Sequence, residues 1–159
     1  MGSDRRPLFR VPPPAIFIFV FLIALWIEAA VYRIWLVPDV QTPRALVFSG
    51  GALMLLGAAL ALWAAVWFRR SQTPIMPYQR ATKIVVAGPY GYSRNPMYVG
   101  LALIHVGGSI ALNAAWPILL LPVALMLLYF LVIRAEEAML AESFGEEYES
   151  YRGRVRRWL

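Results

Sequence analysis

The chain has 159 residues, of which 60% are hydrophobic and only 15% are charged. A soluble domain is closer to half apolar and a quarter charged, and the core of one small domain cannot hide such an apolar excess. The composition therefore argues against a water-soluble enzyme and against intrinsic disorder. The sequence has no cysteine and one histidine, His105, so disulfides, thiolate catalysis and metal sites built on Cys or on several His are excluded.

Long apolar runs predict an all-α membrane protein with four transmembrane helices. The first two runs exceed the roughly 20 residues needed to cross a bilayer core, whereas the last two have about 16–17 residues and lie at the lower limit. The short connection between the last two predicts a tight helical hairpin. The four predicted spans are residues 15–37, 45–68, 97–112 and 117–133.

The basic residues indicate the orientation of these spans. The chain carries 15 Lys and Arg against 9 Asp and Glu, and every basic residue except Arg33 and Arg44 falls on one predicted side. This is the positive-inside pattern, which places both termini in the cytoplasm and explains the net charge of +6 without a nucleic-acid partner. The first apolar run is too long for a cleaved signal peptide and predicts a retained anchor.

Residues 71–98 form the first of two polar segments on the predicted cytoplasmic side. Its prolines forbid one continuous helix, residues 88–91 predict a turn, and Asn95-Pro96 begins the third span. Such a loop at a helix N-terminus could hold an anionic group on its free N–H donors. The alternative is an ordered connector that its tyrosines anchor at the membrane interface.

Residues 134–158 form the second polar segment. Apolar residues spaced three and four apart predict an amphipathic cytoplasmic helix with a bend at Gly145. Glu136 and Glu137 follow the fourth span directly, where a carboxylate needs a partner or a water-filled cavity. One reading is a salt bridge between Arg134 and Glu137 with a solvated acidic face. The other is a pocket between the two polar segments that admits a polar cofactor from water and an apolar substrate from the membrane.

Two motifs in these segments resemble those of a known family. The first is Gly88-Pro89-Tyr90 followed by Arg94-Asn95-Pro96-Met97-Tyr98-x-Gly100, and the second is Glu136-Glu137-x-x-Leu140 followed by Phe144-Gly145-x-x-Tyr148-x-x-Tyr151. Together they resemble integral-membrane methyltransferases of the isoprenylcysteine carboxyl methyltransferase type. Phospholipid N-methyltransferases and bacterial thiol S-methyltransferases share this architecture. The resemblance covers about residues 45–158 and suggests a bacterial member in the inner membrane.

The resemblance implies that S-adenosylmethionine binds in a cytoplasmic pocket and that a lipophilic acceptor enters from the membrane. It implies catalytic roles for Arg134 and Glu137 and no metal. Two departures are Asn95, where many members have His, and Arg156-Arg157, where the family often has Pro-Arg. The residues that would contact the cofactor are Gly88, Pro89, Tyr90, Arg94, Asn95, Pro96, Tyr98 and Glu136.

The residue inventory agrees with methyl transfer from a sulfonium. This displacement needs no metal, cysteine or histidine, because alignment of nucleophile, methyl and leaving sulfur is its main requirement. Glu137 could accept a proton from an amine or thiol acceptor, or favour the cationic cofactor electrostatically. The alternatives are an NADPH-dependent membrane reductase of lipid double bonds and a non-enzymatic membrane scaffold.

Two polar residues inside the predicted spans lie outside both motifs. His105 is expected to make a helix–helix hydrogen bond. Glu28 lies near the centre of the first span, where burial of an unpaired charge is costly, so it should face protein in a packing or homodimer contact.

Overall fold

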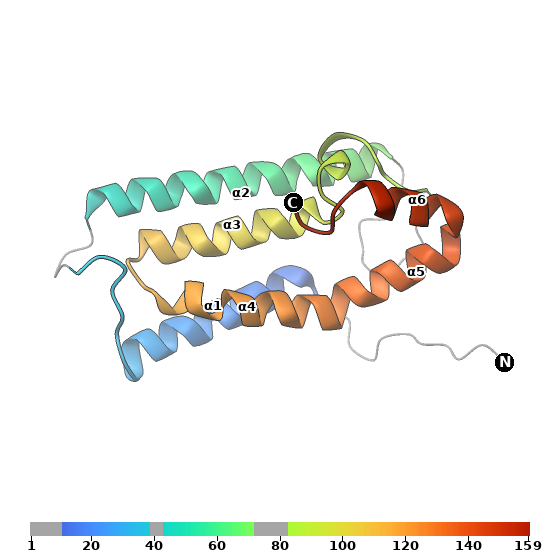
Figure 1. Ribbon diagram of the computed structural model, residues 1–159. Helices are drawn as coiled ribbons and strands as arrows, with labels where there is room; N and C mark the ends of the chain where they lie inside the picture. Colours follow the sequence, from blue (N-terminus) through green and yellow to red (C-terminus); the bar gives the residue numbers. More distant parts are fainter. Residues whose placement is uncertain (1–10, 39–42, 72–82) are drawn as a thin grey trace.

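The computed structural model describes residues 11–38, 43–71 and 83–159, and these fold into helices joined by short turns (Figure 1). The described part contains no β-strand, only an isolated bridge between Trp35 and Ala114. The all-α prediction is thereby confirmed. In chain order the elements are α1 (Pro13–Ala30), α2 (Arg44–Arg70), the 3₁₀ turn η1 (Gly88–Gly91), α3 (Pro96–Ala111), α4 (Trp116–Leu128), the π-helical turn η2 (Tyr129–Ile133), α5 (Arg134–Phe144) and α6 (Glu146–Arg154).

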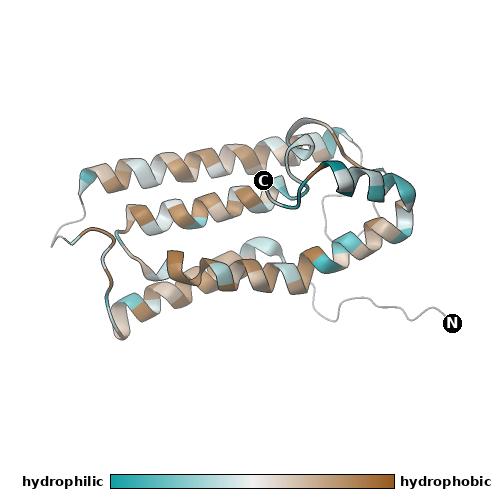
Figure 2. Ribbon diagram, viewed as in Figure 1, coloured by the Kyte–Doolittle hydropathy of each residue, from teal (hydrophilic) through white to brown (hydrophobic). Residues whose placement is uncertain are grey.

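Three helices are long and apolar enough to cross a membrane: α1, α2 and the continuous helix Trp116–Phe144, which runs from α4 through η2 into α5. The helix α3 is apolar but has only 16 residues. Figure 2 shows the hydrophobic colour concentrated on α1–α4, and the hydrophilic colour in α6 and at the end of the bundle where α5 and α6 lie. The prediction of helices long and apolar enough to cross a membrane is thus confirmed for three of them, while the count of four spans and their orientation stay predictions.

The first predicted span, residues 15–37, is wrong at its end, because α1 stops at Ala30. Residues 31–37 instead lie across the turn between α3 and α4. The backbone N–H of Ala115 donates to Ile34 O at 2.9 Å, and the Asn113 side chain bonds both the N–H and the carbonyl of Val37 at 2.9 Å. The α3–α4 turn therefore satisfies backbone groups that a longer α1 would have satisfied within the helix.

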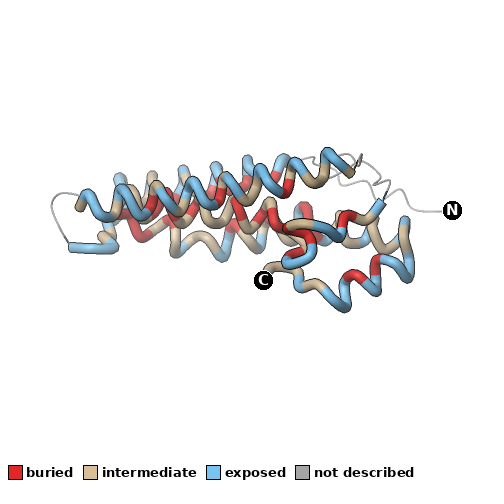
Figure 3. The backbone as a smooth tube through the Cα atoms, turned by 90° about the horizontal axis from the view of Figure 1, so that it is seen from above, coloured by how far each residue is buried: buried red, intermediate tan, exposed pale blue. Residues whose placement is uncertain are grey.

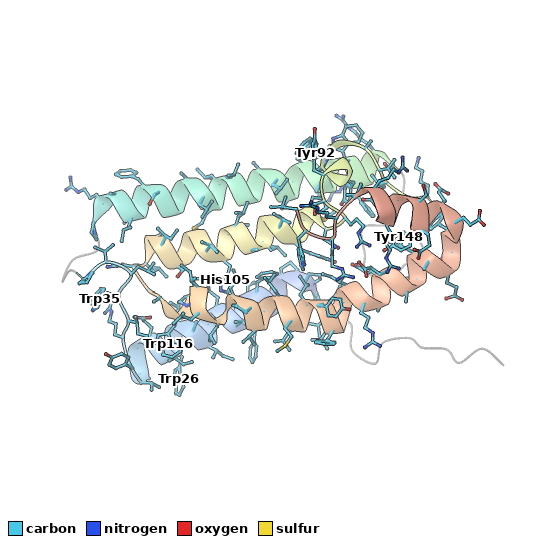
Figure 4. The ribbon with its side chains drawn as sticks, viewed as in Figure 1. Trp26, Trp35, Tyr92, His105, Trp116 and Tyr148 are labelled. Atoms are coloured by element: carbon cyan, nitrogen blue, oxygen red, sulfur yellow. The ribbon has the colours of Figure 1, made fainter. Side chains whose placement is uncertain are left out.

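Glu28 is buried by residues of its own chain, and its carboxylate contacts the α3–α4 turn and the segment after α1. Its Oε1 accepts from Ile34 N–H at 2.9 Å and its Oε2 faces Trp116 N–H, the first of α4, at 3.5 Å. The Arg33 guanidinium lies 4.0 Å away, and the Trp116 indole donates to Tyr32 O at 2.7 Å. A carboxylate at a helix N-terminus is electrostatically favourable. Trp35 and Trp116 mark this end of the molecule in Figure 4.

Glycines bring α2 and α3 into backbone contact along their length (Figure 1). A Cβ added at Gly57 would lie 2.5 Å from Gly100 O, and a Cβ added at Gly107 would lie 2.6 Å from Gly50 O. Small residues at such positions are the usual means by which membrane helices approach closely. Seen from above in Figure 3, the red buried stretches face neighbouring helices and the blue exposed stretches face outward.

The fourth predicted span, 117–133, continues without a break into the polar segment. The helix passes through the π-helical turn η2 and ends at Phe144, after which Gly145 takes a φ of +49° and α6 turns back toward α3. The predicted bend at Gly145 is confirmed. The His105 ring bonds Pro117 O at 2.9 Å, which confirms the predicted hydrogen bond between α3 and α4.

Candidate functional site

The turn η1 holds the first motif against α2 and α6. Gly88 has a φ of +62°, and a Cβ there would come within 2.6 Å of the Trp67 indole, so both the backbone and the available space require glycine. The Tyr90 ring packs beside Phe68 with centroids 5.3 Å apart, and the Tyr151 hydroxyl donates to Tyr90 O at 2.8 Å. Burial raises the pKa of Tyr90 well above its ordinary value, so the phenol stays neutral. Gly88 and Tyr90 therefore hold η1 in place between α2 and α6.

The C-terminal tail lies against residues 93–95. The Arg94 N–H donates to Arg156 O at 2.9 Å, and the Asn95 amide donates to Arg157 O at 3.1 Å. The Ser93 hydroxyl also donates to Arg157 O, at 3.3 Å. Asn95, which stands where the resembling family often has His, thus bonds the tail backbone. Pro96, predicted to contact the cofactor, is buried at the start of α3, and Pro89 is buried in η1.

Glu137 is the centre of a charged cluster, formed by Arg94, Glu137, Tyr148 and Arg157 and named here the Glu137 cluster. Arg157 binds the carboxylate through Nε to Oε1 and Nη2 to Oε2, both at 2.9 Å. Arg94 Nη1 lies 3.1 Å from Oε1 and also donates to the Tyr148 hydroxyl at 3.2 Å. The Arg94 side chain is only 10% exposed, and its Nε has no hydrogen-bond partner among the residues that the structure describes. Both oxygens of Glu137 are therefore engaged by guanidinium groups.

Glu136 has a different environment from its neighbour. It lies beyond Ile133, where the apolar part of the helix ends, and the Tyr98 hydroxyl donates to its two oxygens at 3.0 and 3.1 Å. Burial raises the pKa of Glu136, the Tyr98 hydrogen bond lowers it, and the nearby Glu137 charge raises it, so that the pKa lies at about 7 in place of the ordinary 4.5. Two adjacent carboxylates thus face different partners, one a neutral phenol and the other two cations.

We expect the raised pKa of Glu136 to make the fold less stable as pH rises. Between the ordinary value of 4.5 and about 7 the folded chain holds a proton that the unfolded chain has released, so unfolding becomes easier through this window. The thermal midpoint of the wild type, relative to that of Glu136→Gln, should fall between pH 5 and pH 8 in detergent. Parallel midpoint curves for the two proteins would contradict this expectation.

Arg134 does not join the Glu137 cluster. Its side chain is exposed, and it makes no ion pair with any carboxylate of the described residues. The salt bridge between Arg134 and Glu137 that the spacing suggested is therefore not formed, because Arg94 and Arg157 occupy the carboxylate. The structure brings together Arg94, Asn95, Tyr98, Glu136 and Glu137 at one end of the bundle. Figure 4 places the label of Tyr148 at this end and that of His105 well away from it.

Sequence reasoning missed Arg157, Tyr148 and Ser93 as members of this site. Arg157 was visible only as part of a departure from the resembling family's tail. Tyr148 was visible as a position of the second motif and of the amphipathic helix, but no site role was assigned to it. Across the part of the chain that the structure describes, no three His, Cys, Asp or Glu side chains converge as metal ligands.

Comparisons with known proteins point to one family. Residues 45–147 match the family model described as phospholipid methyltransferase. A protein-S-isoprenylcysteine O-methyltransferase of Schizosaccharomyces pombe is 36% identical over 72 residues, which cover 45% of this chain and 30% of that relative. The chain thus matches less than a third of the relative's length. No solved structure matches the chain. The family match includes Gly88, Tyr98, Glu136 and Glu137 and ends before Tyr148.

Proposed function

Because the chain belongs to the phospholipid methyltransferase family, we propose that it transfers a methyl group from S-adenosylmethionine to a lipophilic acceptor at the membrane interface. The observation that carries this proposal is that a carboxylate and a guanidinium N–H with spare hydrogen-bonding capacity lie at the same end of an apolar bundle. Within the described part of the chain, Glu136 accepts hydrogen bonds only from Tyr98, and the buried Arg94 Nε has no hydrogen-bond partner. The Glu136 carboxylate can bind a cationic group, and the Arg94 Nε–H can donate a hydrogen bond to an anionic group.

These two groups fit the cofactor's own charges. S-adenosylmethionine carries a sulfonium, an ammonium and a carboxylate, and it supplies an activated methyl group. Glu136 would hold the cationic part, because a carboxylate with one neutral donor keeps lone pairs available. Arg94 Nε would donate to the carboxylate, which relieves a buried donor that is otherwise unsatisfied. Tyr98 would orient Glu136 through its hydroxyl.

The structure changes the roles that we assign to Glu137 and Arg134. Glu137 binds two guanidinium groups through both oxygens, so we assign it the task of holding Arg94 in place. Arg134 is exposed directly after the apolar residues that end at Ile133, where it could bind a carboxylate or phosphate of the acceptor. An acceptor that is already a carboxylate needs no base, and alignment then provides most of the catalysis.

Basic residues and helix packing support a cytoplasmic position for the end of the bundle that holds Glu136 and Glu137. Arg69 and Arg70 end α2 here, and Val11 and Ile16 near the start of α1 pack against the core that contains Tyr98 and Ile133. The proposed topology therefore keeps the start of α1 and the C-terminal tail on the side where the cofactor is available.

Incubation of membranes containing the protein with methyl-labelled S-adenosylmethionine tests the function. We expect label in the lipid extract or in a small lipophilic product, and none with Glu136→Gln membranes. A folded, purified protein that binds NADPH in competition with S-adenosylhomocysteine would favour the reductase instead. A protein that binds neither would favour the scaffold and would overturn the proposal.

Tyr98→Phe is expected to weaken cofactor binding by about tenfold, because it removes a hydrogen bond to a charged carboxylate. The matched control is Tyr92→Phe, since Tyr92 is 76% exposed and lies six residues before Tyr98, directly after η1. Isothermal titration with S-adenosylhomocysteine measures both. Equal affinities for the two variants would show that the Tyr98 hydroxyl does not orient a cofactor ligand.

A further inference from the structure

Arg157 joins three parts of the chain that are distant in sequence. Its carbonyl accepts from Ser93 and Asn95, which precede α3, at 3.3 and 3.1 Å. Its guanidinium binds Glu137 of α5 through two bonds of 2.9 Å. The same guanidinium lies over the Tyr129 ring of η2, 5.1 Å from the centroid. One residue of the tail therefore contacts the first motif, the second motif and the π-helical turn.

The bonds to Glu137 are directional. A guanidinium that meets a carboxylate through two parallel bonds sets the plane of the carboxylate as well as its position. Without Arg157, Glu137 would keep only Arg94, through one bond of 3.1 Å to Oε1. The carboxylate could then rotate, and Arg94 would lose a fixed partner beside its unpaired Nε.

The tail on either side of Arg157 is attached independently of this ion pair. The Arg156 carbonyl accepts from Arg94 N–H, whereas the Arg156 side chain is exposed. Trp158 packs against the core cluster that contains Tyr98, Val132 and Ile133. Loss of the Arg157 guanidinium should therefore leave the tail backbone in place and change mainly the Glu137 carboxylate.

We infer that Arg157 is a positioning residue of the proposed cofactor site, acting through Glu137 on Arg94. This inference rests on the proposed function and deepens it, because the family match ends at residue 147 and does not reach the tail. Arg157 itself need not touch the cofactor. Its effect is to keep Arg94 oriented so that the free Nε can meet an anionic group.

The test compares Arg157→Ala and Arg157→Lys with the neighbouring control Arg156→Ala, in full-length protein. The readouts are the Kd for S-adenosylhomocysteine, and the kcat and KM for labelled methyl transfer. We expect Arg157→Ala to weaken binding and raise the KM for S-adenosylmethionine by about tenfold or more, since one side of a charged hydrogen-bonded pair is lost. Arg157→Lys, which keeps the charge but not the two-bond geometry, should fall between Arg157→Ala and wild type. Arg156→Ala should stay within about twofold of wild type, because its side chain makes no bond in the site.

A double-mutant cycle with Glu137→Gln shows whether Arg157 acts through Glu137. The combined variant should bind the cofactor no more weakly than Glu137→Gln alone, because Arg157 acts only through the Glu137 carboxylate. Additive losses, or unchanged binding in Arg157→Ala, would overturn the inference. If Arg157→Ala does not fold, Arg157→Lys decides: wild-type binding by that variant also overturns it. A folded wild type that binds no S-adenosylhomocysteine would instead refute the proposed function, while the thermal midpoints of the same cycle still measure the Arg157–Glu137 coupling.

Discussion

Glu136→Gln is expected to lower cofactor affinity by about 10- to 100-fold and to abolish detectable methyl transfer. Glutamine keeps the shape and one acceptor oxygen for the Tyr98 hydroxyl, but it removes the negative charge that would bind the cationic cofactor. Hydrogen bonds to charged groups contribute about 1.5–3 kcal/mol, which corresponds to this range of affinity. Titration calorimetry with S-adenosylmethionine and with S-adenosylhomocysteine measures the effect.

Comparison of the two ligands sharpens the Glu136 experiment. S-adenosylhomocysteine lacks the sulfonium charge, so a carboxylate that contacts the sulfonium should matter more for S-adenosylmethionine than for the product. The control is Glu142→Gln, because Glu142 lies exposed on the same helix and outside the Glu137 cluster. If Glu136→Gln binds both ligands as tightly as Glu142→Gln does, Glu136 is not a cofactor ligand.

Gly57→Ala is expected to destabilise the fold by about 1–3 kcal/mol, the usual cost of forcing an extra carbon into a packed interface. The added Cβ would lie 2.5 Å from Gly100 O and 2.9 Å from the Leu103 Cβ, so α2 and α3 would have to move apart. Backbone atoms cannot move aside locally in the way that a flexible side chain can. The thermal midpoint in detergent should fall clearly below that of the wild type.

Gly51→Ala is the matched control for Gly57→Ala. It lies on the same helix, and its added Cβ would meet no atom within 4 Å. Alanine has a higher helix propensity than glycine, by about 1 kcal/mol, so this variant should be neutral or slightly stabilised. Equal losses of stability in both variants would mean that glycine contact between α2 and α3 is not what holds these helices together.

Much of the helical framework could be predicted from the order of apolar and polar residues. The second and third predicted spans, 45–68 and 97–112, lie within two residues of α2 and α3 at each end. Burial of apolar surface and the need to satisfy backbone groups within one helix both act along a continuous stretch of chain, so local sequence reports them well. The bend at Gly145 was predictable for the same reason, because a glycine inside a helical pattern readily takes a positive φ.

Residues 31–37 show where this reasoning fails. Their apolar character predicted a continued first span. Their backbone groups instead form hydrogen bonds with Asn113 and Ala115, which lie far away in the sequence. A backbone group can be satisfied by its own helix or by a distant turn, and the composition of the segment is compatible with both. A carboxylate at Glu28 inside an apolar span predicted that the fold must supply it with polar partners. The sequence did not show that the backbone N–H groups of Ile34 and Trp116 would be those partners.

The sequence by itself determined that this protein is an apolar helical chain whose polar residues gather in two segments, 71–98 and 134–158. It also placed Tyr98, Arg94, Glu136 and Glu137 in those segments. Residue type and spacing are enough for such conclusions, because they follow from hydropathy and from short motifs. Only the tertiary structure decided how the two adjacent carboxylates divide their partners. In the fold, Glu137 forms ion pairs with Arg94 and Arg157, and Glu136 accepts a hydrogen bond from Tyr98. Arg134 is exposed. The reason is physical: ion pairs form between groups that the fold brings within about 4 Å, and the turn at Gly145 carries the tail back to α3.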